Sequence, residues 1–161
     1  MMTFTKERTA MVQNYDLDSA LSMLRQGRII LYPTDTIWSI GCDATNPVAI
    51  EKLNRLKKND QEDFEILVDS IQMLKNYVDH LHPRIETLLI YHVRPLTIIF
   101  DNPRNLPSNA ISRKGTISVR LVQDEYCRNL IKEYGCPLLA SFAKFREEPF
   151  PVNFGGVARR R

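Results

Sequence analysis

Residues 27–44 constrain the fold most strongly, because they join an apolar run to a short polar segment. Residues 29–32, Ile-Ile-Leu-Tyr, form a continuous apolar run of the kind found in strands that are covered on both faces. Pro33 has no N–H for a sheet ladder, so we expect the strand to bend or end there. The polar segment Thr34-Asp35-Thr36 follows, and open sheets tend to bind ligands at strand ends. This segment is therefore either a ligand site or a polar turn between two core strands.

The composition is that of an ordinary globular protein. The 161 residues suffice for one domain with a full core, and 43% of them are hydrophobic. No apolar run approaches the roughly 20 residues of a membrane span. Residues 1–13 lack the apolar centre of a secretion signal, so we expect a cytoplasmic protein that does not enter a membrane. A net charge of +3 is compatible with an anionic ligand or RNA and is weak evidence for either.

Apolar periodicity predicts several helices and strands. Apolar residues from Leu17 to Leu24 fall on one face of a helix that begins after Asp16 and ends near Gly27. Further helices are predicted over residues 48–58, from Ser70 to Val78, from Pro83 to about Tyr91, and over residues 124–134. Strands are predicted at residues 29–32, 64–68, 95–100, 115–121 and 137–141.

Helices and strands alternate along the chain, and several connections are short. Short connections favour a mixed sheet over a purely parallel one. We therefore predict an α/β fold, with a single domain (residues 16–161) that contains a twisted mixed sheet and flanking helices. Residues 1–15 are predicted to form a flexible N-terminal arm.

Polar residues at helix and strand ends are further candidates for binding. Lys57 and Lys58 end a predicted helix, where the alternative is a surface cap that interacts with the helix dipole. Residues 140–144, Ala-Ser-Phe-Ala-Lys, end a predicted strand, where backbone N–H groups can bind an anion. Three cysteines in no metal-like spacing, with three histidines, do not indicate a zinc site.

Thr116, Ser118 and Arg120 lie on one face of the alternating strand 115–121. Either this face meets water, or Arg120 points into a cleft and binds a carboxylate or phosphate through two hydrogen bonds. The chain has no P-loop, no G-x-G-x-x-G motif and no nucleophile elbow. The residues of this strand alone leave both alternatives open.

Taken together and in order, these segments resemble the YrdC-like family, the threonylcarbamoyl-AMP synthases. The matching segments are GRIILYPTDTIWSIGCDA (27–44), AIEKLNRLKK (49–58), ILVDS (66–70), RPLTII (94–99), GTISVR (115–120) and CPLLAS (136–141). The resemblance extends over residues 17 to about 154. It implies a twisted α/β fold with a large concave basic cavity.

The resemblance also implies a function, that of an L-threonylcarbamoyladenylate synthase. Such a nucleotidyltransferase condenses L-threonine, bicarbonate and ATP into threonylcarbamoyl-AMP and pyrophosphate with Mg²⁺. A partner complex then transfers the threonylcarbamoyl group to tRNA, so tRNA or double-stranded RNA is a further expected partner. The implied threonine-binding residues are Thr34, Thr36 and Arg120. The implied nucleotide-binding residues are Lys57, Lys58, Thr116, Ser118, Ala140 and Ser141, and no catalytic residue or protein metal ligand is assigned.

Several residues depart from the family's pattern near the expected phosphate site. Asn59 stands where the family has an arginine, and the acidic pair Glu62-Asp63 stands where it has a lysine or arginine. Phe142 and Lys144 replace the serine and asparagine of a Ser-Ala-Asn signature. The chain also ends before the family's C-terminal segment, so the domain is predicted to be truncated there. Two hypotheses remain: a synthase, or a catalytically impaired paralogue that binds nucleotide or RNA without this turnover.

Overall fold

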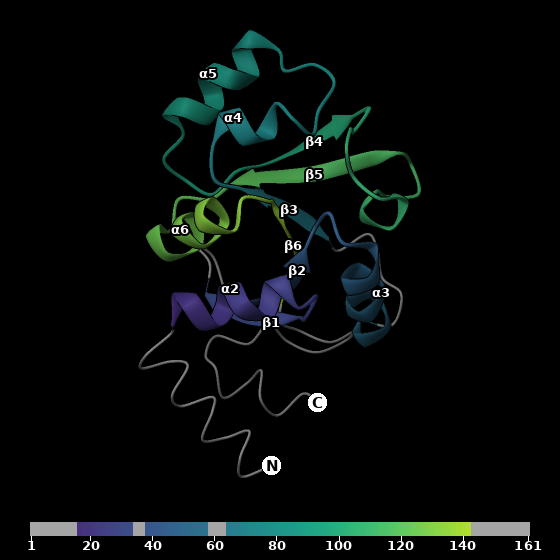
Figure 1. Ribbon diagram of the computed structural model, residues 1–161. Coiled ribbons are helices and arrows are strands. Elements are labelled where there is room, and N and C mark those ends of the chain that lie inside the picture. The colour runs from purple at the N-terminus through teal and green to yellow at the C-terminus, as the bar shows by residue number, and fades with distance from the viewer. Residues whose placement is uncertain (1–15, 34–37, 58–63, 143–161) are drawn as a thin grey trace.

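The computed structural model describes residues 16–33, 38–57 and 64–142 (Figure 1). The strands are β1 (Ile30–Pro33), β2 (Trp38–Asp43), β3 (Glu65–Val68), β4 (Thr97–Asp101), β5 (Thr116–Leu121) and β6 (Leu138–Phe142). The helices are α2 (Leu17–Arg25), α3 (Pro47–Leu56), α4 (Ile71–Leu74), α5 (Pro83–Tyr91), α6 (Glu125–Tyr134) and the 3₁₀ helix η2 (Ser108–Ala110). The predicted arm of residues 1–15 lies outside the described residues.

The described strands form one six-stranded sheet in the order β1-β2-β6-β3-β5-β4. Strands β3 and β5 run parallel, whereas every other pair of neighbours is antiparallel. Strands β1 and β4 are the two edges. The prediction of an α/β fold with a mixed sheet and flanking helices is therefore confirmed.

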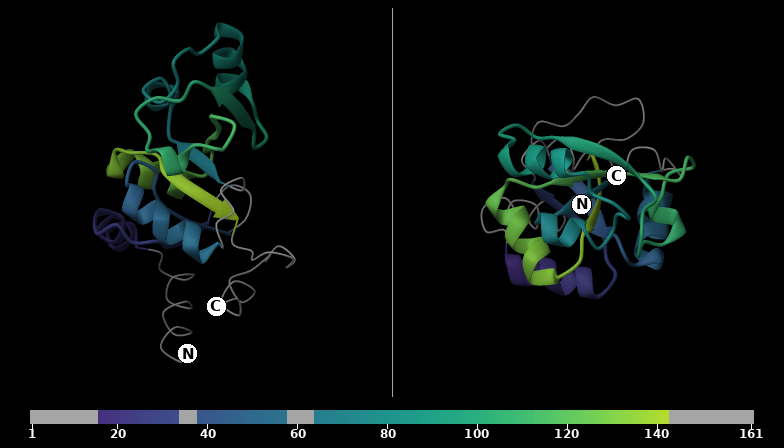
Figure 2. Two further views of the ribbon diagram at one scale, coloured as in Figure 1. Left: turned by 90° about the vertical axis from the view of Figure 1, so that its right-hand side faces the viewer. Right: turned by 90° about the horizontal axis from the view of Figure 1, so that it is seen from above.

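Helices pack on both faces of this sheet. Helix α3 shares one apolar core with Ile66 of β3. Helices α2 and α6 lie side by side on the opposite face (Figures 1 and 2) and share a second core with Leu67. Successive residues of β3 thus enter different cores, as the alternation of side chains along a strand requires.

Strand β1 also contributes to both cores. Ile30 and Tyr32 are buried in the core that contains α2 and α6. Ile29 and Leu31 are half-buried and pack against the core that contains α3. The predicted burial of residues 29–32 on both faces is therefore confirmed.

Side-chain caps explain where three of the helices begin. Asp16, Asn46 and Asp124 each accept a hydrogen bond from a backbone N–H in the first turn of α2, α3 and α6, respectively. Gly135 follows α6 with a φ of 86°, a left-handed conformation that glycine adopts readily. The predicted positions of these helices are confirmed.

The predicted helix from Ser70 to Val78 is wrong beyond its first turn. Helix α4 is only four residues long. Val78 instead forms an isolated β-bridge with Pro103, and the Tyr77 carbonyl accepts a hydrogen bond from the Arg104 N–H at 2.8 Å. Pairing with the loop after β4 therefore takes the place of further helical turns.

At one end of the sheet, β5 and β6 both extend beyond Glu65, the first residue of the strand β3 that lies between them. Its register pairs Ile66 with Val119 of β5, so Thr116 lies beyond the first residue of β3. On the other side, Glu65 pairs with Ala140, and β6 continues past this pair. We call this end of the sheet the fork: Glu65 lies at its base, between the start of β5 and the end of β6.

Candidate functional site at the fork of the sheet

The polar face predicted for β5 is present, and it is largely buried. Arg120 is 2% exposed, whereas Thr116 and Ser118 are half-buried. Ile117 and Val119 point to the opposite face and belong to the core with α3. The alternative in which this polar face simply meets water is therefore wrong for Arg120.

Glu65 balances the charge of Arg120. Arg120 Nε and Nη2 each lie 3.3 Å from Glu65 Oε2. Thr97 Oγ1 donates a hydrogen bond to Glu65 Oε1 at 2.6 Å. The side chain of Glu65 is 17% exposed, so this carboxylate lies between the buried guanidinium and solvent. Neither Glu65 nor Thr97 is in the predicted set, although an acidic residue inside the apolar segment 64–68 was an available signal.

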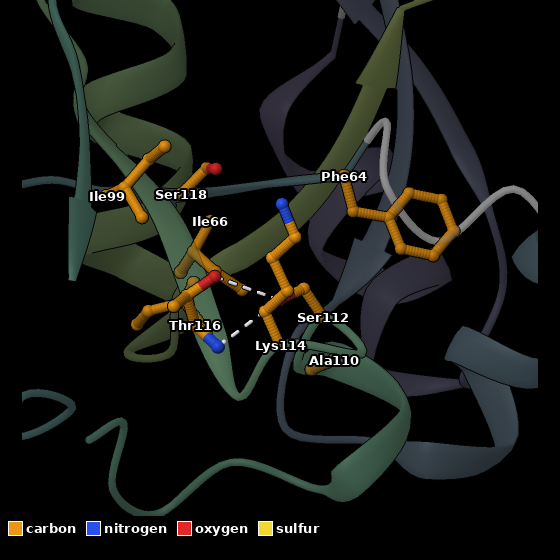
Figure 3. A pocket seen from close by; sticks show the side chains of 9 residues that line it. Phe64, Ile66, Ile99, Ala110, Ser112, Lys114, Thr116 and Ser118 are labelled. Atoms are coloured by element: carbon orange, nitrogen blue, oxygen red, sulfur yellow. Dashed lines mark hydrogen bonds between the residues drawn. The ribbon is translucent and has the colours of Figure 1, made fainter. Parts of the chain in front are cut away.

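A pocket of about 180 Å³ adjoins the start of β5 (Figure 3). It is lined by Phe64, Ile66, Ile99, Ala110, Ser112, Lys114, Thr116, Ile117 and Ser118. Ser112 Oγ and Thr116 Oγ1 lie 2.9 Å apart, and the Thr116 N–H donates to Ser112 Oγ at 3.2 Å. Figure 3 shows the Lys114 side chain extending along the same pocket. A cation and several hydroxyls between apolar walls suit an anionic small molecule.

Lys114 and Ser112 are absent from the predicted set of site residues. They lie in a turn before β5, in which the Ser112 N–H donates to the Thr116 carbonyl at 2.9 Å and the Gly115 N–H donates to the Ser112 carbonyl at 3.0 Å. Gly115 has a φ of 78°, which favours glycine at this point of the turn. The basic pair Arg113-Lys114, immediately before the predicted strand 115–121, was the signal for this turn.

Lys57 is buried at the end of α3, with 8% exposure. The backbone N–H of Lys57 donates to the Leu53 carbonyl at 2.9 Å and completes the last helical turn. Lys57 is thus the C-cap residue of α3, and it is buried rather than on the surface. Lys58, Thr34 and Thr36 lie outside the described residues, so their roles stay predictions.

The end of β6 lies on the other side of the fork from β5. Ala140 is 2% exposed and lies between Gly41 and Glu65 in the sheet. Ser141 is 3% exposed, and its Oγ has no hydrogen-bond partner among the described residues. Buried hydroxyls are usually paired, so Ser141 is a candidate to bond a ligand. The described residues exclude Asn59, Glu62, Asp63, Lys144 and the side chain of Phe142.

No group of three or more His, Cys, Asp or Glu side chains in the described ranges could hold a metal ion. No helix within those ranges combines the length and apolar character that a bilayer span requires.

Comparison with known proteins identifies first the fold and then the family. The structure superposes on that of P. abyssi Sua5 complexed with L-threonine with a TM-score of 0.82, at 22% identity, over 89% of this chain and 43% of that one. It superposes on E. coli YciO with a TM-score of 0.69, at 22% identity, over 82% of this chain and 65% of that one. This chain therefore spans less than half of the P. abyssi protein. These likenesses define a Sua5- and YciO-like fold.

The family follows from the sequence comparisons. Residues 22–160 match the Sua5/YciO/YrdC family model, which is described as "Telomere recombination". The threonylcarbamoyl-AMP synthase of Pseudoalteromonas translucida is 33% identical over 129 residues, which cover 78% of this chain and 69% of that protein. The chain belongs to the Sua5/YciO/YrdC family. The resemblance noted from residues 27–44 and the later segments is confirmed.

Proposed function

We propose that this protein is an L-threonylcarbamoyladenylate synthase, which condenses L-threonine, bicarbonate and ATP into threonylcarbamoyl-AMP and pyrophosphate. The observation that carries the proposal is a buried arginine, Arg120, on a strand whose hydroxyls line an adjoining pocket. A buried guanidinium suits the carboxylate of an amino acid, and a polar pocket with a lysine suits a nucleotide phosphate. The name of the P. translucida relative supports the same activity.

In this reaction the protein's main task is to position three reactants. The threonine amine forms a bond to the carbon of CO₂ derived from bicarbonate and loses a proton. An oxygen of the resulting carbamate then forms a bond to the α-phosphorus of ATP, and pyrophosphate leaves as the bond between the α-phosphorus and its bridging oxygen breaks. Holding these groups in contact supplies much of the rate enhancement.

Each site residue has a distinct role in this proposal. Arg120 binds the threonine carboxylate, and the hydroxyls of Thr116 and Ser118 orient the nucleotide. Lys57 and Lys114 stabilise negative charge on the phosphates, which grows as pyrophosphate leaves. Mg²⁺ would enter bound to ATP, where it neutralises phosphate charge.

The proposed partners follow from the product. A threonylcarbamoyl adenylate is an activated acyl group, so a transfer complex that modifies a tRNA adenosine is its expected consumer in the cytoplasm. Direct binding of tRNA or double-stranded RNA belongs to the same proposal.

The second candidate is a catalytically impaired paralogue that binds nucleotide or RNA without this turnover. The observation that favours it is the loss of cationic residues at Asn59, Glu62 and Asp63. Loss of one cation from a phosphate site commonly slows a reaction by about a hundredfold or more.

Pyrophosphate release from ATP tests the proposal. The synthase should release pyrophosphate only when both L-threonine and bicarbonate are present. Folded protein that binds ATP but shows no threonine-dependent release would instead be the impaired paralogue. In that case the double variant Asn59→Arg/Phe142→Ser should raise turnover, and salt-dependent binding of RNA would favour a role in RNA recognition.

A further inference from the structure

The ion pair at the fork gives the proposed threonine site both signs of charge. Arg120 is 2% exposed and contacts Glu65 Oε2 through Nε and Nη2, each at 3.3 Å. Glu65 is held from the other side by Thr97, whose hydroxyl donates to Oε1 at 2.6 Å. The guanidinium therefore has a counter-charge of its own before any ligand arrives.

This counter-charge changes which ligands the site can accept. A carboxylate that lacks an amine would be attracted by Arg120 and repelled by the adjacent carboxylate of Glu65. An amino acid in its zwitterionic form has a negative carboxylate for Arg120 and a positive ammonium for Glu65. A neutral ion pair thus matches a neutral zwitterion better than it matches an anion.

Glu65 also retains the hydrogen-bonding capacity that an ammonium group needs. Each oxygen of a carboxylate can accept about two hydrogen bonds. Oε2 receives two contacts from Arg120, whereas Oε1 receives one hydrogen bond from Thr97. One acceptor position on Oε1 is therefore available without breaking the ion pair.

We infer, on the basis of the proposed function, that Glu65 is a specificity-determining residue that accepts a hydrogen bond from the α-ammonium group of the amino acid bound to Arg120. The pair Glu65–Arg120 then selects zwitterionic amino acids against carboxylates without an amine. Thr97 keeps the Glu65 carboxylate in place.

Calorimetric titration of the full chain with two ligands tests this role. L-threonine and (R)-3-hydroxybutanoate share the carboxylate, hydroxyl and methyl groups, and only threonine has the amine. Wild-type protein should bind L-threonine at least about tenfold more tightly, as expected for a hydrogen bond between charged groups. Glu65→Gln should weaken threonine binding by at least about tenfold and leave (R)-3-hydroxybutanoate within about threefold of wild type. Thr97→Val keeps the carboxylate and removes one hydrogen bond that positions it, so its preference for threonine should fall less than that of Glu65→Gln.

Several results would overturn the inference. Tighter threonine binding by Glu65→Gln would mean that Glu65 competes with the ligand for Arg120. Equal affinity of the wild type for both ligands would mean that the ammonium group is not recognised. The proposed function survives either result if pyrophosphate release still depends on threonine, whereas both proposals fail if the folded wild type binds neither ligand and releases no pyrophosphate. If Glu65→Gln does not fold, as thermal unfolding would show, the wild-type preference decides alone.

Discussion

Arg120 is among the largest fully buried side chains of the described residues, and its charge is balanced inside the protein by Glu65. Removing one partner of a buried ion pair typically costs about 3–5 kcal/mol, because the remaining charge is left without compensation. Glu65 is 17% exposed, so water solvates it in part, and we expect Arg120→Met to lower the free energy of unfolding by about 2 kcal/mol.

Urea unfolding measures this effect, and a double variant provides the control. Arg120→Met/Glu65→Met removes both charges, so its free energy of unfolding should return to within about 1 kcal/mol of wild type. If Arg120→Met unfolds at the same urea concentration as wild type, the ion pair contributes nothing to stability and only the binding role of Arg120 remains.

Lys114 offers a second test at the scale of single residues. It lines the pocket beside β5, whereas its exposed neighbour Arg113 is not among the lining residues. We expect Lys114→Gln to weaken binding of Mg-ATP about fivefold, equivalent to about 1 kcal/mol for a solvent-accessible charge. Calorimetric titration with Arg113→Gln is the matched control, because that variant removes the same charge outside the pocket. Equal losses in the two variants would show that only the net charge matters.

At Gly41, strand β2 passes close to the backbone of a neighbouring strand. Gly41 pairs with Ile30 of β1 and with Ala140 of β6. A Cβ atom at Gly41 would lie 2.3 Å from the Leu139 carbonyl oxygen and 2.8 Å from Tyr32 Oη. The first of these atoms belongs to the backbone of a central strand, so the clash cannot be relieved by a side-chain rotation.

We therefore expect Gly41→Ala to lower the free energy of unfolding by about 2–3 kcal/mol, as overpacking in a core does. Gly115→Ala is the control, because a Cβ there meets nothing within 4 Å and only the left-handed φ of 78° is unfavourable. That strain should cost about 1 kcal/mol. Urea unfolding of both variants gives the comparison, and a Gly41→Ala loss no larger than that of Gly115→Ala would contradict close packing at β2.

The sequence predicts an element well when one short segment contains both its apolar periodicity and the residues that end it. Helix α2 has its apolar face and its capping residue, Asp16, within one short segment. The prediction of a helix as far as Val78 failed because the competing hydrogen-bond partner is distant in sequence. The Arg104 N–H donates to the Tyr77 carbonyl. No local pattern contains that information.

In the candidate site, too, local features were predicted and features that depend on distant residues were not. Alternation along β5 placed Thr116, Ser118 and Arg120 on one face, which follows from the geometry of a single strand. The partnership of Arg120 with Glu65 joins residues 55 positions apart and depends on the parallel register of β3 and β5. Register is set by the whole sheet, so sequence pattern alone placed one partner of the pair and missed the other.

For the whole molecule, a polar cluster far from the fork joins three elements. Tyr134, at the end of α6, donates a hydrogen bond to Asp43 Oδ2 at 2.6 Å, and its hydroxyl lies 3.2 Å from the Leu24 carbonyl of α2. Asp43 pairs with Leu138, at the opposite end of β6 from the fork. Changes in this cluster should therefore affect stability separately from ligand binding.

Tyr134 of this cluster and Cys42, which precedes Asp43 in β2, make stability sensitive to alkaline pH. Burial, with a smaller effect from the charge of Asp43, raises the pKa of the Cys42 thiol from 9.0 to about 12. Burial and the hydrogen bond to Asp43 also raise the pKa of Tyr134 above its ordinary value. In the unfolded chain both groups lose their protons at lower pH than in the folded protein. The free energy of unfolding should therefore fall as pH rises above about 9, because the unfolded state then binds fewer protons.

Urea unfolding at pH 7, 8, 9 and 10 measures this dependence. Each group contributes a slope of at most about 1.4 kcal/mol per pH unit in the range where only the unfolded state is ionised. Cys42→Ala removes its share of the slope above pH 9, although lost packing also lowers stability by a similar amount at every pH. The slope, rather than the absolute stability, is therefore the quantity to compare, and the interval from pH 7 to 8 serves as the internal control. An unchanged slope in Cys42→Ala would mean that the thiol ionises as easily in the folded protein as in the unfolded chain.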